Sequence, residues 1–428
     1  MLNEIIKTLK NSDADAWEVN DVSKKGWEFY FIKHNLDQNR FKDTEHIQVT
    51  VYKKIEDGKY LGKASMEIPL TETEDEVKTD IDHLLQRAEL VKNKVYTLRT
   101  PKKAEAMHEG KINVKETSED FINLMNDIPE TKTEDINSYE IFTDEITRHF
   151  INSEGIDITE TYPKSMMEVV TNARNAEHEI ELYRMYHGGT CDKEGIRNDL
   201  IKTMQYGKDR LSTVPTPKLS QYAVVFSGAD AVSIYDYFKE RLNTASIYEK
   251  FSDWKKGTAI ADNITGDKVT LEALRYLENS DANHTYDEEG TPVRDEVLMK
   301  EDVPCAFWGS AQYSSYLGEE NTFILTNYAV SGGTESEEEI RSGNYLEVVE
   351  FSDFQVSAVT GDIFGEIRLG YLHEGNTVKA VTGGSVSGNM HDFVKNMHMS
   401  IDTVQHNNAR IPSLTRLENV TISGIVEE

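Results

Sequence analysis

Histidine, cysteine and acidic side chains lie close enough together in parts of this sequence to suggest a metal site. The densest group contains His178, Glu179, His187 and Cys191. A zinc peptidase binds its metal through three protein ligands and lowers the pKa of the bound water to about 7. If this stretch were helical, His178 and His187 would face opposite sides, because each residue turns the helix by about 100°. The two glycines after His187 would end that helix before Cys191, so we predict surface side chains here.

A second pair, His391 and His398, is seven residues apart and would share one helix face. Two helical turns span about 10 Å, too far for two ligands that each lie about 2 Å from one zinc ion. Asp392 is the only acidic residue close to this pair in the sequence. No G-x-S-x-G motif occurs either, so a serine nucleophile has no support. These patterns therefore assign no catalytic, metal-binding or cofactor-binding residue.

Length and charge limit the classes of function that remain. The chain has 428 residues, 38% of them hydrophobic, and a net charge of −30. This length exceeds what one ordinary core needs, so we predict two domains. The acidic residues are spread along the chain, which indicates a solvated surface. Nucleic acid is excluded as a direct ligand, because phosphate binding needs clustered Lys and Arg.

The beginning of the chain and its cysteines indicate a compartment. MLNEIIKTLKNSDADAW is amphipathic with mixed charge and lacks the apolar segment and cleavage site of a signal peptide. No run reaches the roughly 18 apolar residues of a membrane helix. Cys191 and Cys305 lie far apart, and without an export signal we expect both to be reduced thiols. We therefore expect a cytoplasmic protein that does not bind membranes.

The elements that must position the side chains begin with a short helix, since apolar residues recur at helical spacing from Leu2 to Leu9. Thr73 and Glu76 form a capping box ahead of a longer helix. Between these helices, strand-like runs joined by polar turns predict an antiparallel meander. The runs are Trp17–Val22, Trp27–Ile32, His46–Val51 and Tyr60–Ile68.

Further along, Thr97–Lys115 is polar and aperiodic and is predicted to be an irregular surface connection. Strands are predicted at Ser138–Thr143 and Thr147–Asn152, on either side of a turn at Asp144-Glu145. A helical pattern then runs from Lys193 to Leu211.

We predict a domain boundary at the next stretch, Thr213–Pro217, because its two prolines stop a helix and favour extended backbone. This divides the chain into residues 1–212, an N-terminal α+β domain, and residues 213–428, a β-rich domain. Nine of the 26 glycines precede Pro215 and seventeen follow it, mostly in turns between short apolar runs. The glycine-bounded acidic stretch Ser331–Gly343 is predicted to be a mobile loop. The predicted fold class is therefore α+β.

Several short motifs occur in an order that resembles the TldD/PmbA family, also called the modulator of DNA gyrase family. Each is a common turn sequence by itself, but their order over most of the chain carries the resemblance. The motifs are Asn152-Ser153-Glu154-Gly155, the segment Asp287–Arg294, Thr360-Gly361-Asp362, Gly388-Asn389 and Pro412-Ser413-Leu414. By itself, the Asp287-Glu288-Glu289-Gly290 part of the second motif predicts a solvated turn. The resemblance implies a PmbA/TldD-like two-domain fold.

In the catalytic branch of that family, zinc is bound by an HExxxH motif on the helix after the first strand of the second domain, together with a later cysteine. Here the corresponding helix, Ser233–Arg241, has no histidine, and Lys239 and Arg241 would repel a cation. No cysteine follows Cys305. The resemblance therefore points to the PmbA or TldE-like branch, with no catalytic, metal or cofactor site in this chain.

What the resemblance implies about function is a catalytically inert subunit of a TldD/TldE-type zinc metallopeptidase system that processes or degrades unfolded peptides. The expected partners are a TldD-like catalytic subunit, which would hold the zinc, and an unfolded peptide or small protein. We expect an oligomer in solution, and the surface that meets the partner could also support a homodimer when the chain is alone. Two alternatives remain open: a stand-alone peptide-binding or scaffold protein, and a metallopeptidase with an unrecognised metal site.

Overall fold

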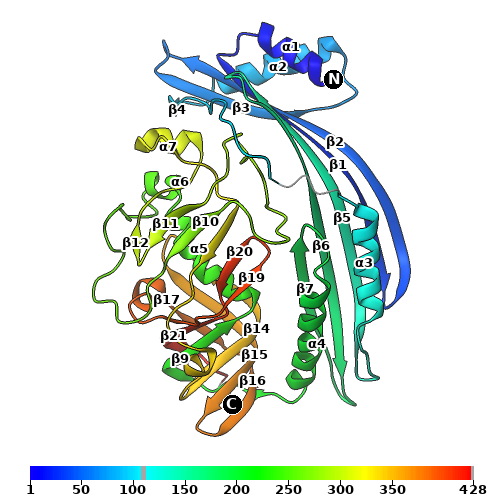
Figure 1. Cartoon of the computed structure of the whole chain (residues 1–428), viewed down its shortest axis with the longest axis vertical. Coiled ribbons are helices and arrows are strands. Elements are labelled where there is room, and N and C mark those ends of the chain that lie inside the picture. The colour runs from blue at the N-terminus through cyan, green and yellow to red at the C-terminus, as the bar shows by residue number, and fades with distance from the viewer. Residues whose placement is uncertain (108–111, 426–428) are drawn as a thin grey trace.

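The computed structural model describes residues 1–107 and 112–425. Its amino-terminal half is built around one antiparallel sheet of seven strands in the order β4-β3-β2-β1-β5-β6-β7, and the longest of them curve along one side of the molecule (Figure 1). The strands are β1 (Ala16–Ile32), β2 (Asn35–Ile55), β3 (Tyr60–Ile68), β4 (Asn93–Lys94), β5 (Glu134–Asn152), β6 (Asp157–Arg174) and β7 (Glu179–Gly188).

The antiparallel meander is confirmed for β1, β2 and β3, which pair in sequence order. The predicted runs Trp17–Val22 and Trp27–Ile32 are not two strands, because the backbone continues between them as the single strand β1. The predicted turn at Asp144-Glu145 is wrong, because both residues lie inside β5 and pair with Lys25 and Gly26 of β1. Polar residues interrupt the apolar pattern of both strands at this point, and the backbone continues through them. Gly26 lies so close to β5 that a Cβ there would overlap the Thr143 carbonyl oxygen and the Asp144 side chain.

Four helices cover one face of this sheet with two separate apolar clusters. Near one end, α1 (Leu2–Asn11) and α2 (Glu74–Ala88) bury Ile5, Leu9, Ile81 and Leu84 against β1 and β2. The predicted capping box of α2 is present, since Thr73 and Glu76 bond each other's backbone. At the other end, α3 (Val114–Asn126) and α4 (Lys193–Arg210) pack on β5 and β6. The predicted connection between α2 and α3 includes residues 108–111, which lie outside the described residues.

The carboxyl-terminal half contains two further sheets. A six-stranded sheet has the order β12-β11-β10-β13-β20-β19. Its strands are β10 (Leu271–Leu274), β11 (Glu296–Lys300), β12 (Val303–Pro304), β13 (Asn327–Val330), β19 (Thr403–His406) and β20 (Ala409–Pro412). In the part of the chain that the structure describes, no strand of the seven-stranded sheet lies beyond Gly188, and every strand of the other two sheets begins at or after Val214. The boundary between residues 212 and 213 stays a prediction.

The eight-stranded sheet contains a closed ring. β14 pairs with both β9 and β15, and β21 and β17 complete the circuit. The strands are β8 (Val214–Pro215), β9 (Leu219–Ser227), β14 (Tyr345–Val356), β15 (Asp362–Glu374), β16 (Thr377–Thr382), β17 (Ser385–Asn389), β18 (His398–Met399) and β21 (Leu414–Ile422). The large core of this half lies between this sheet, the six-stranded sheet and helix α5 (Val232–Arg241).

The remaining helices of this half are short. They are η1 (Ala229–Ala231), α6 (Thr244–Tyr248), α7 (Ala311–Leu317), α8 (Glu337–Ile340) and α9 (Met390–Phe393). The prediction of a mobile loop at Ser331–Gly343 is wrong, because this segment contains helix α8. Ser336 and Glu339 form a capping box, and Ile340 is fully buried, so this acidic segment is anchored to the core. Among the described residues, no helix is both long and apolar enough to span a bilayer. The α+β class is confirmed.

Candidate functional site

Helix α5 contains Ser233–Arg241, the residues expected to correspond to the metal-binding helix of the catalytic branch. Its buried face, including Ile234 and Phe238, packs into the carboxyl-terminal core. On its more exposed side, the Lys239 ammonium lies 2.7 Å from Asp236 Oδ1 and 3.3 Å from Glu240 Oε1. It also lies 5.3 Å from the centre of the Tyr328 ring. Tyr328 donates a hydrogen bond of 2.9 Å to Asp236 Oδ1.

This arrangement keeps Lys239 charged. Burial disfavours the ammonium, but the neighbouring carboxylates of Asp236 and Glu240 outweigh it, so the pKa of Lys239 lies above its ordinary value. The carboxylates of Asp236 and Glu240 are paired with the Lys239 ammonium, which a zinc ion would have to displace, and α5 offers no histidine or cysteine beside them. The residues of α5 therefore do not fit a zinc ion.

The other basic residue noted on this helix, Arg241, has a structural role. Its side chain is buried, donates to the carbonyl oxygens of Phe251 and Ala358, and pairs with Asp253 at 2.7 Å. Its guanidinium also lies over the Trp254 ring. Arg241 thus holds two loops against α5.

The histidines considered in the sequence lie on separate elements. His178 is in the turn between β6 and β7, and His187 is in β7, so the stretch is a strand pair and not a helix. His391 is in α9 and His398 is in β18, so these two do not share a helix face.

His398 instead meets acidic residues from distant parts of the sequence. Its Nδ1 lies 2.6 Å from Glu335 Oε1, and Asp267 offers a carboxylate oxygen within 4.8 Å of the ligand atoms of both. Asp267 Oδ2 accepts a hydrogen bond from the Met399 amide, and its Oδ1 accepts one from the Thr334 hydroxyl. The sequence analysis missed this cluster, because the three residues are far apart in the chain and no local spacing relates them.

The Asp287–Gly290 segment, predicted to be a solvated turn, is a turn with Glu288 exposed, but Asp287 is buried and Glu289 pairs with Arg99 from the amino-terminal half. Asp287 is 1% exposed and accepts hydrogen bonds from the amides of Glu289, Thr291 and Ile324. From the seven-stranded sheet, Arg148 donates to the carbonyl oxygens of Asp287 and Glu288. The sequence prediction failed for Asp287 and Glu289 because these acids are satisfied by backbone amides and by an arginine from elsewhere in the chain.

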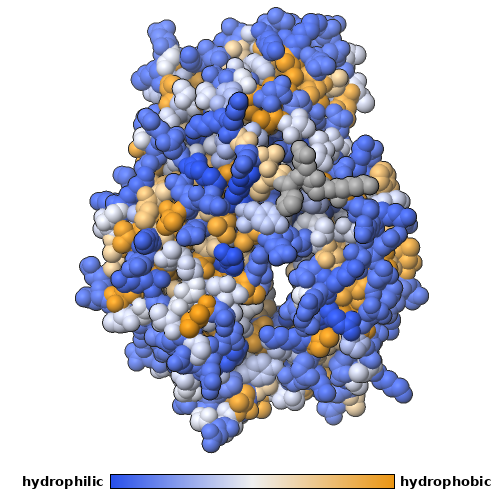
Figure 2. All heavy atoms as spheres, in the orientation of Figure 1, coloured by the Kyte–Doolittle hydropathy of each residue, from blue (hydrophilic) through white to orange (hydrophobic). Residues whose placement is uncertain are grey.

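One face of the seven-stranded sheet contacts the carboxyl-terminal half through Arg148, Glu160, Tyr162 and Lys164. Among the described residues, the helices of the amino-terminal half pack on the opposite face of this sheet. Cross-strand partners on this face form two rows, because directly opposed residues point to the same side. The rows are Tyr30, Glu140, Glu168 and Met185, and Glu28, Phe142, Met166 and His187. The space-filling view shows an opening between the two halves beside β7 (Figure 2). This face therefore presents aromatic, thioether and acidic side chains in sequence-distant strands.

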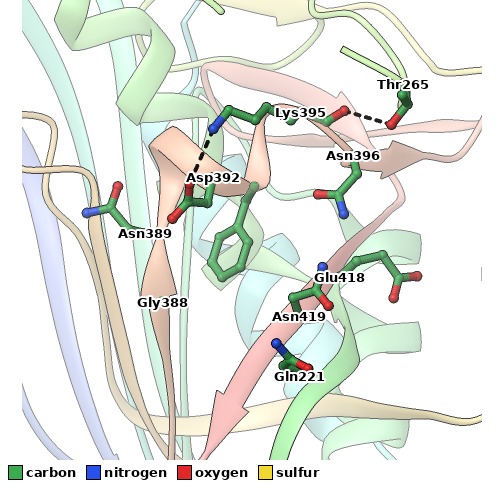
Figure 3. A pocket seen from close by; sticks show the side chains of 10 residues that line it. Gln221, Thr265, Gly388, Asn389, Asp392, Lys395, Asn396, Glu418 and Asn419 are labelled. Atoms are coloured by element: carbon green, nitrogen blue, oxygen red, sulfur yellow. Dashed lines mark hydrogen bonds and ion pairs between the residues drawn. The ribbon is translucent and has the colours of Figure 1, made fainter. Parts of the chain in front are cut away.

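A surface pocket of about 490 Å³ lies at the other side of the carboxyl-terminal half, where β9, β17, β21 and α9 meet (Figure 3). Gln221 and Asn419 line it at an irregularity in the β9–β21 pairing, and both have left-handed backbone, with φ of 54° and 61°. Asp392 and Lys395 form an ion pair of 3.3 Å at its edge. Most of the residues that line this pocket are polar, and none of them belongs to β7.

Similarity to known proteins supports the architecture. Residues 219–424 match the family model of the PmbA/TldA metallopeptidase C-terminal domain. The fold is similar to the crystal structure of TldE from Thermococcus kodakarensis, with a TM-score of 0.79 and 16% identity over 99% of this chain and 100% of that chain. A proposed modulator of DNA gyrase from Thermotoga maritima gives a TM-score of 0.78 and 15% identity, covering 98% of both chains.

A corresponding protein from Bacteroides thetaiotaomicron gives a TM-score of 0.77 and 16% identity over 99% of this chain and 98% of that one. No curated protein sequence matches the chain. At these identities, the solved structures show that the whole chain shares their fold. The family model matches the carboxyl-terminal half of the chain.

Proposed function

Because the chain belongs to the metallopeptidase-related TldD/PmbA family, we propose that it is the non-catalytic, TldE-like subunit of a TldD/TldE-type zinc peptidase system. One observation carries this proposal: the exposed side of α5 holds the Lys239 ammonium between two carboxylates in place of metal ligands. A chain that cannot bind zinc there has no means of activating water at that position. Catalysis is assigned to a TldD-like partner that carries the metal.

The role of this subunit in the system is to bind an unfolded peptide. The uncovered face of the seven-stranded sheet offers apolar and aromatic side chains such as Phe142 and Tyr30, whose rings meet edge to face at 5.8 Å. β7 is an edge strand of the same sheet, and it borders the opening between the halves. An extended peptide can pair with such an edge through main-chain hydrogen bonds, which bind without strict dependence on sequence.

Peptide binding by the isolated chain is the second candidate function. The opening beside β7 is formed within one chain and needs no partner. A labelled unfolded protein such as fluorescein-casein would therefore gain fluorescence anisotropy with the chain alone under this alternative. Binding only in the presence of a TldD-like subunit would support the two-subunit system instead.

The decisive experiment measures peptidase activity of the purified chain, of an HExxxH-bearing homologue from the same host, and of their mixture. We expect cleavage of an unfolded peptide by the mixture, complete inhibition by a chelator, and no cleavage by this chain alone. Light scattering should show a hetero-oligomer, with a homodimer when the chain is alone. Chelator-sensitive cleavage by the isolated chain would refute the non-catalytic role.

A further inference from the structure

We propose that Asp267, Glu335 and His398 form a binding site for a divalent first-row transition metal ion, with zinc as the preferred occupant. Each residue offers one ligand atom, and the three atoms lie within 4.8 Å of one another. The site is distinct from the side chains of α5 and goes beyond the proposed function. It concerns a metal that ties segments together in this chain and not the peptidase chemistry of a partner.

Three separate segments are fixed so that these ligands meet. Asp267 lies before β10, Glu335 lies between β13 and α8, and His398 belongs to β18. The backbone of Glu335 is held by a bridge to Ser400, with the Ile401 amide donating to the Glu335 carbonyl oxygen at 2.8 Å. His398 is opposite Arg416 in the β18–β21 pairing. The ligand-bearing backbones are therefore positioned by main-chain contacts that do not depend on a metal.

Glycines allow these segments to approach each other. A Cβ at Gly266 would overlap the Met397 carbonyl oxygen, and a Cβ at Gly332 would overlap that of Ile401. A Cβ at Gly333 would overlap the Met399 carbonyl oxygen and crowd Asp267 Oδ2. Only glycine can stand at such close approaches of backbone to backbone. The two carboxylates and the imidazole come together because each acidic residue follows glycine closely in the sequence.

The charges of the cluster favour a cation. Asp267 is 8% exposed, and within residues 1–107 and 112–425 it forms no ion pair with Lys or Arg. The only basic group paired with Glu335 in that part of the chain is His398 itself. A largely buried carboxylate without a counter-ion is costly, and a second carboxylate nearby raises that cost. A divalent ion would compensate both while the imidazole binds in its neutral form.

The types of ligand atom determine which metal ion this site prefers. One imidazole nitrogen and two carboxylate oxygens match zinc, whose bonds to these atoms are about 2.0–2.2 Å. Calcium takes six to eight oxygen ligands and magnesium a near-octahedral oxygen shell, which this cluster does not offer. The side chains of Glu335 and His398 are each 32% exposed, so a fourth position can be filled from solvent. In the metal-bound form the ion would replace the proton shared between His398 Nδ1 and Glu335 Oε1.

The test is isothermal titration of the metal-stripped full chain with zinc chloride. Millimolar magnesium in the buffer would occupy weak sites on the acidic surface. We expect one zinc per chain in the wild type and affinity lowered at least tenfold in His398→Gln and Glu335→Gln. Loss of even an outer partner of a ligand costs about 10–100-fold in affinity. His391→Gln is the matched control and should bind as the wild type does.

Cobalt provides a second readout, because protein-bound Co²⁺ gives visible absorption bands that depend on its ligands. These bands should appear in the wild type and in His391→Gln and be absent in His398→Gln, with circular dichroism verifying that each variant is folded. No saturable zinc binding by the wild type, or equal binding by His398→Gln, would overturn the site and leave a His398–Glu335 hydrogen bond only. These measurements use the isolated chain and no peptide, so they stand or fail independently of the proposed function.

Discussion

The Arg99 guanidinium and the Glu289 carboxylate meet across the two halves of the chain, with Arg99 Nε 3.1 Å from Glu289 Oε2. Arg99 also donates to the Gly309 carbonyl oxygen and the Thr322 hydroxyl, both at 3.0 Å. The Ala311 amide donates to Glu289 as well, at 2.7 Å. This ion pair therefore fixes the segment after β4 to the loops of the carboxyl-terminal half.

Replacing Arg99 by alanine should destabilise the contact between the halves. At pH 8, where Glu289 is ionised, the substitution leaves this largely buried carboxylate without its cation, and breaking such a pair costs about 3 kcal/mol of unfolding free energy. Urea unfolding followed by tryptophan fluorescence measures the change. Lys7→Ala, which removes an exposed pair with Glu74, is the control and should cost less than about 1 kcal/mol. Equal effects of the two substitutions would contradict this role of Arg99.

Glu289 should make stability depend on pH. Burial raises the pKa of Glu289 from 4.5 to about 7, although Arg99 and the Ala311 amide act in the opposite direction. Above pH 4.5 the unfolded chain has released this proton while the folded chain still holds it. The contribution is therefore full below pH 4.5 and is lost as pH rises through 7.

The variant Glu289→Gln keeps a neutral side chain of similar shape at every pH. Between pH 5 and pH 8 its melting temperature should fall less than that of the wild type. Differential scanning calorimetry at several pH values tests this. Parallel profiles for the two proteins would show that Glu289 does not titrate in this range.

Phe142 should contribute to binding of an unfolded peptide by the uncovered sheet face. Truncation to alanine removes one aromatic side chain from that face, and a loss of about 1 kcal/mol corresponds to about fivefold in Kd. Fluorescence anisotropy of labelled casein measures it, with the TldD-like subunit present if the chain alone does not bind. Phe364→Ala, which removes a 45% exposed phenylalanine on β15, is the control and should leave Kd unchanged. Equal affinities for all three proteins would place the peptide elsewhere.

Gly26 should be necessary for the close pairing of β1 with β5. A methyl group there overlaps the Thr143 carbonyl oxygen, so Gly26→Ala must push the two strands apart at the centre of the sheet. Overpacking of this kind costs about 1–3 kcal/mol. Ser23→Ala, a small substitution in the same strand, should cost less, and thermal unfolding compares them. A Gly26→Ala protein as stable as Ser23→Ala would contradict the pairing described.

Local patterns predicted much of the fold. The capping box of Thr73 and Glu76 begins α2, and the alternating runs from Trp17 to Ile68 form the antiparallel meander. These features depend on residues near one another in sequence, so their physics can be read locally. Asp144 was predicted to lie in a turn, but it lies inside β5. In the sequence alone, a polar residue in a turn looks the same as a polar residue in the middle of a strand.

The site was less predictable, because its contacts are made at long range. The sequence shows that Ser233–Arg241 has no histidine or cysteine. It does not show that Lys239 and Asp236 both contact Tyr328, because Tyr328 comes from the distant strand β13. The same holds for Asp287, which is buried by amides of its own loop and of Ile324. His398 was compared only with His391, its neighbour in sequence, and not with acids brought close by glycine-rich segments.

The ring formed by β14, β9, β21, β17 and β15 has a consequence for how this protein avoids aggregation. Where the strands of this ring are paired on both sides they have no free edge, and those parts cannot recruit a strand from another molecule. β7 ends the seven-stranded sheet and keeps such an edge, and its first residues include Glu179 and Glu181. Repeated negative charge along that part of the edge discourages pairing between identical copies. The part of β7 without acidic residues, from Met185 to His187, is where unwanted association between copies would begin.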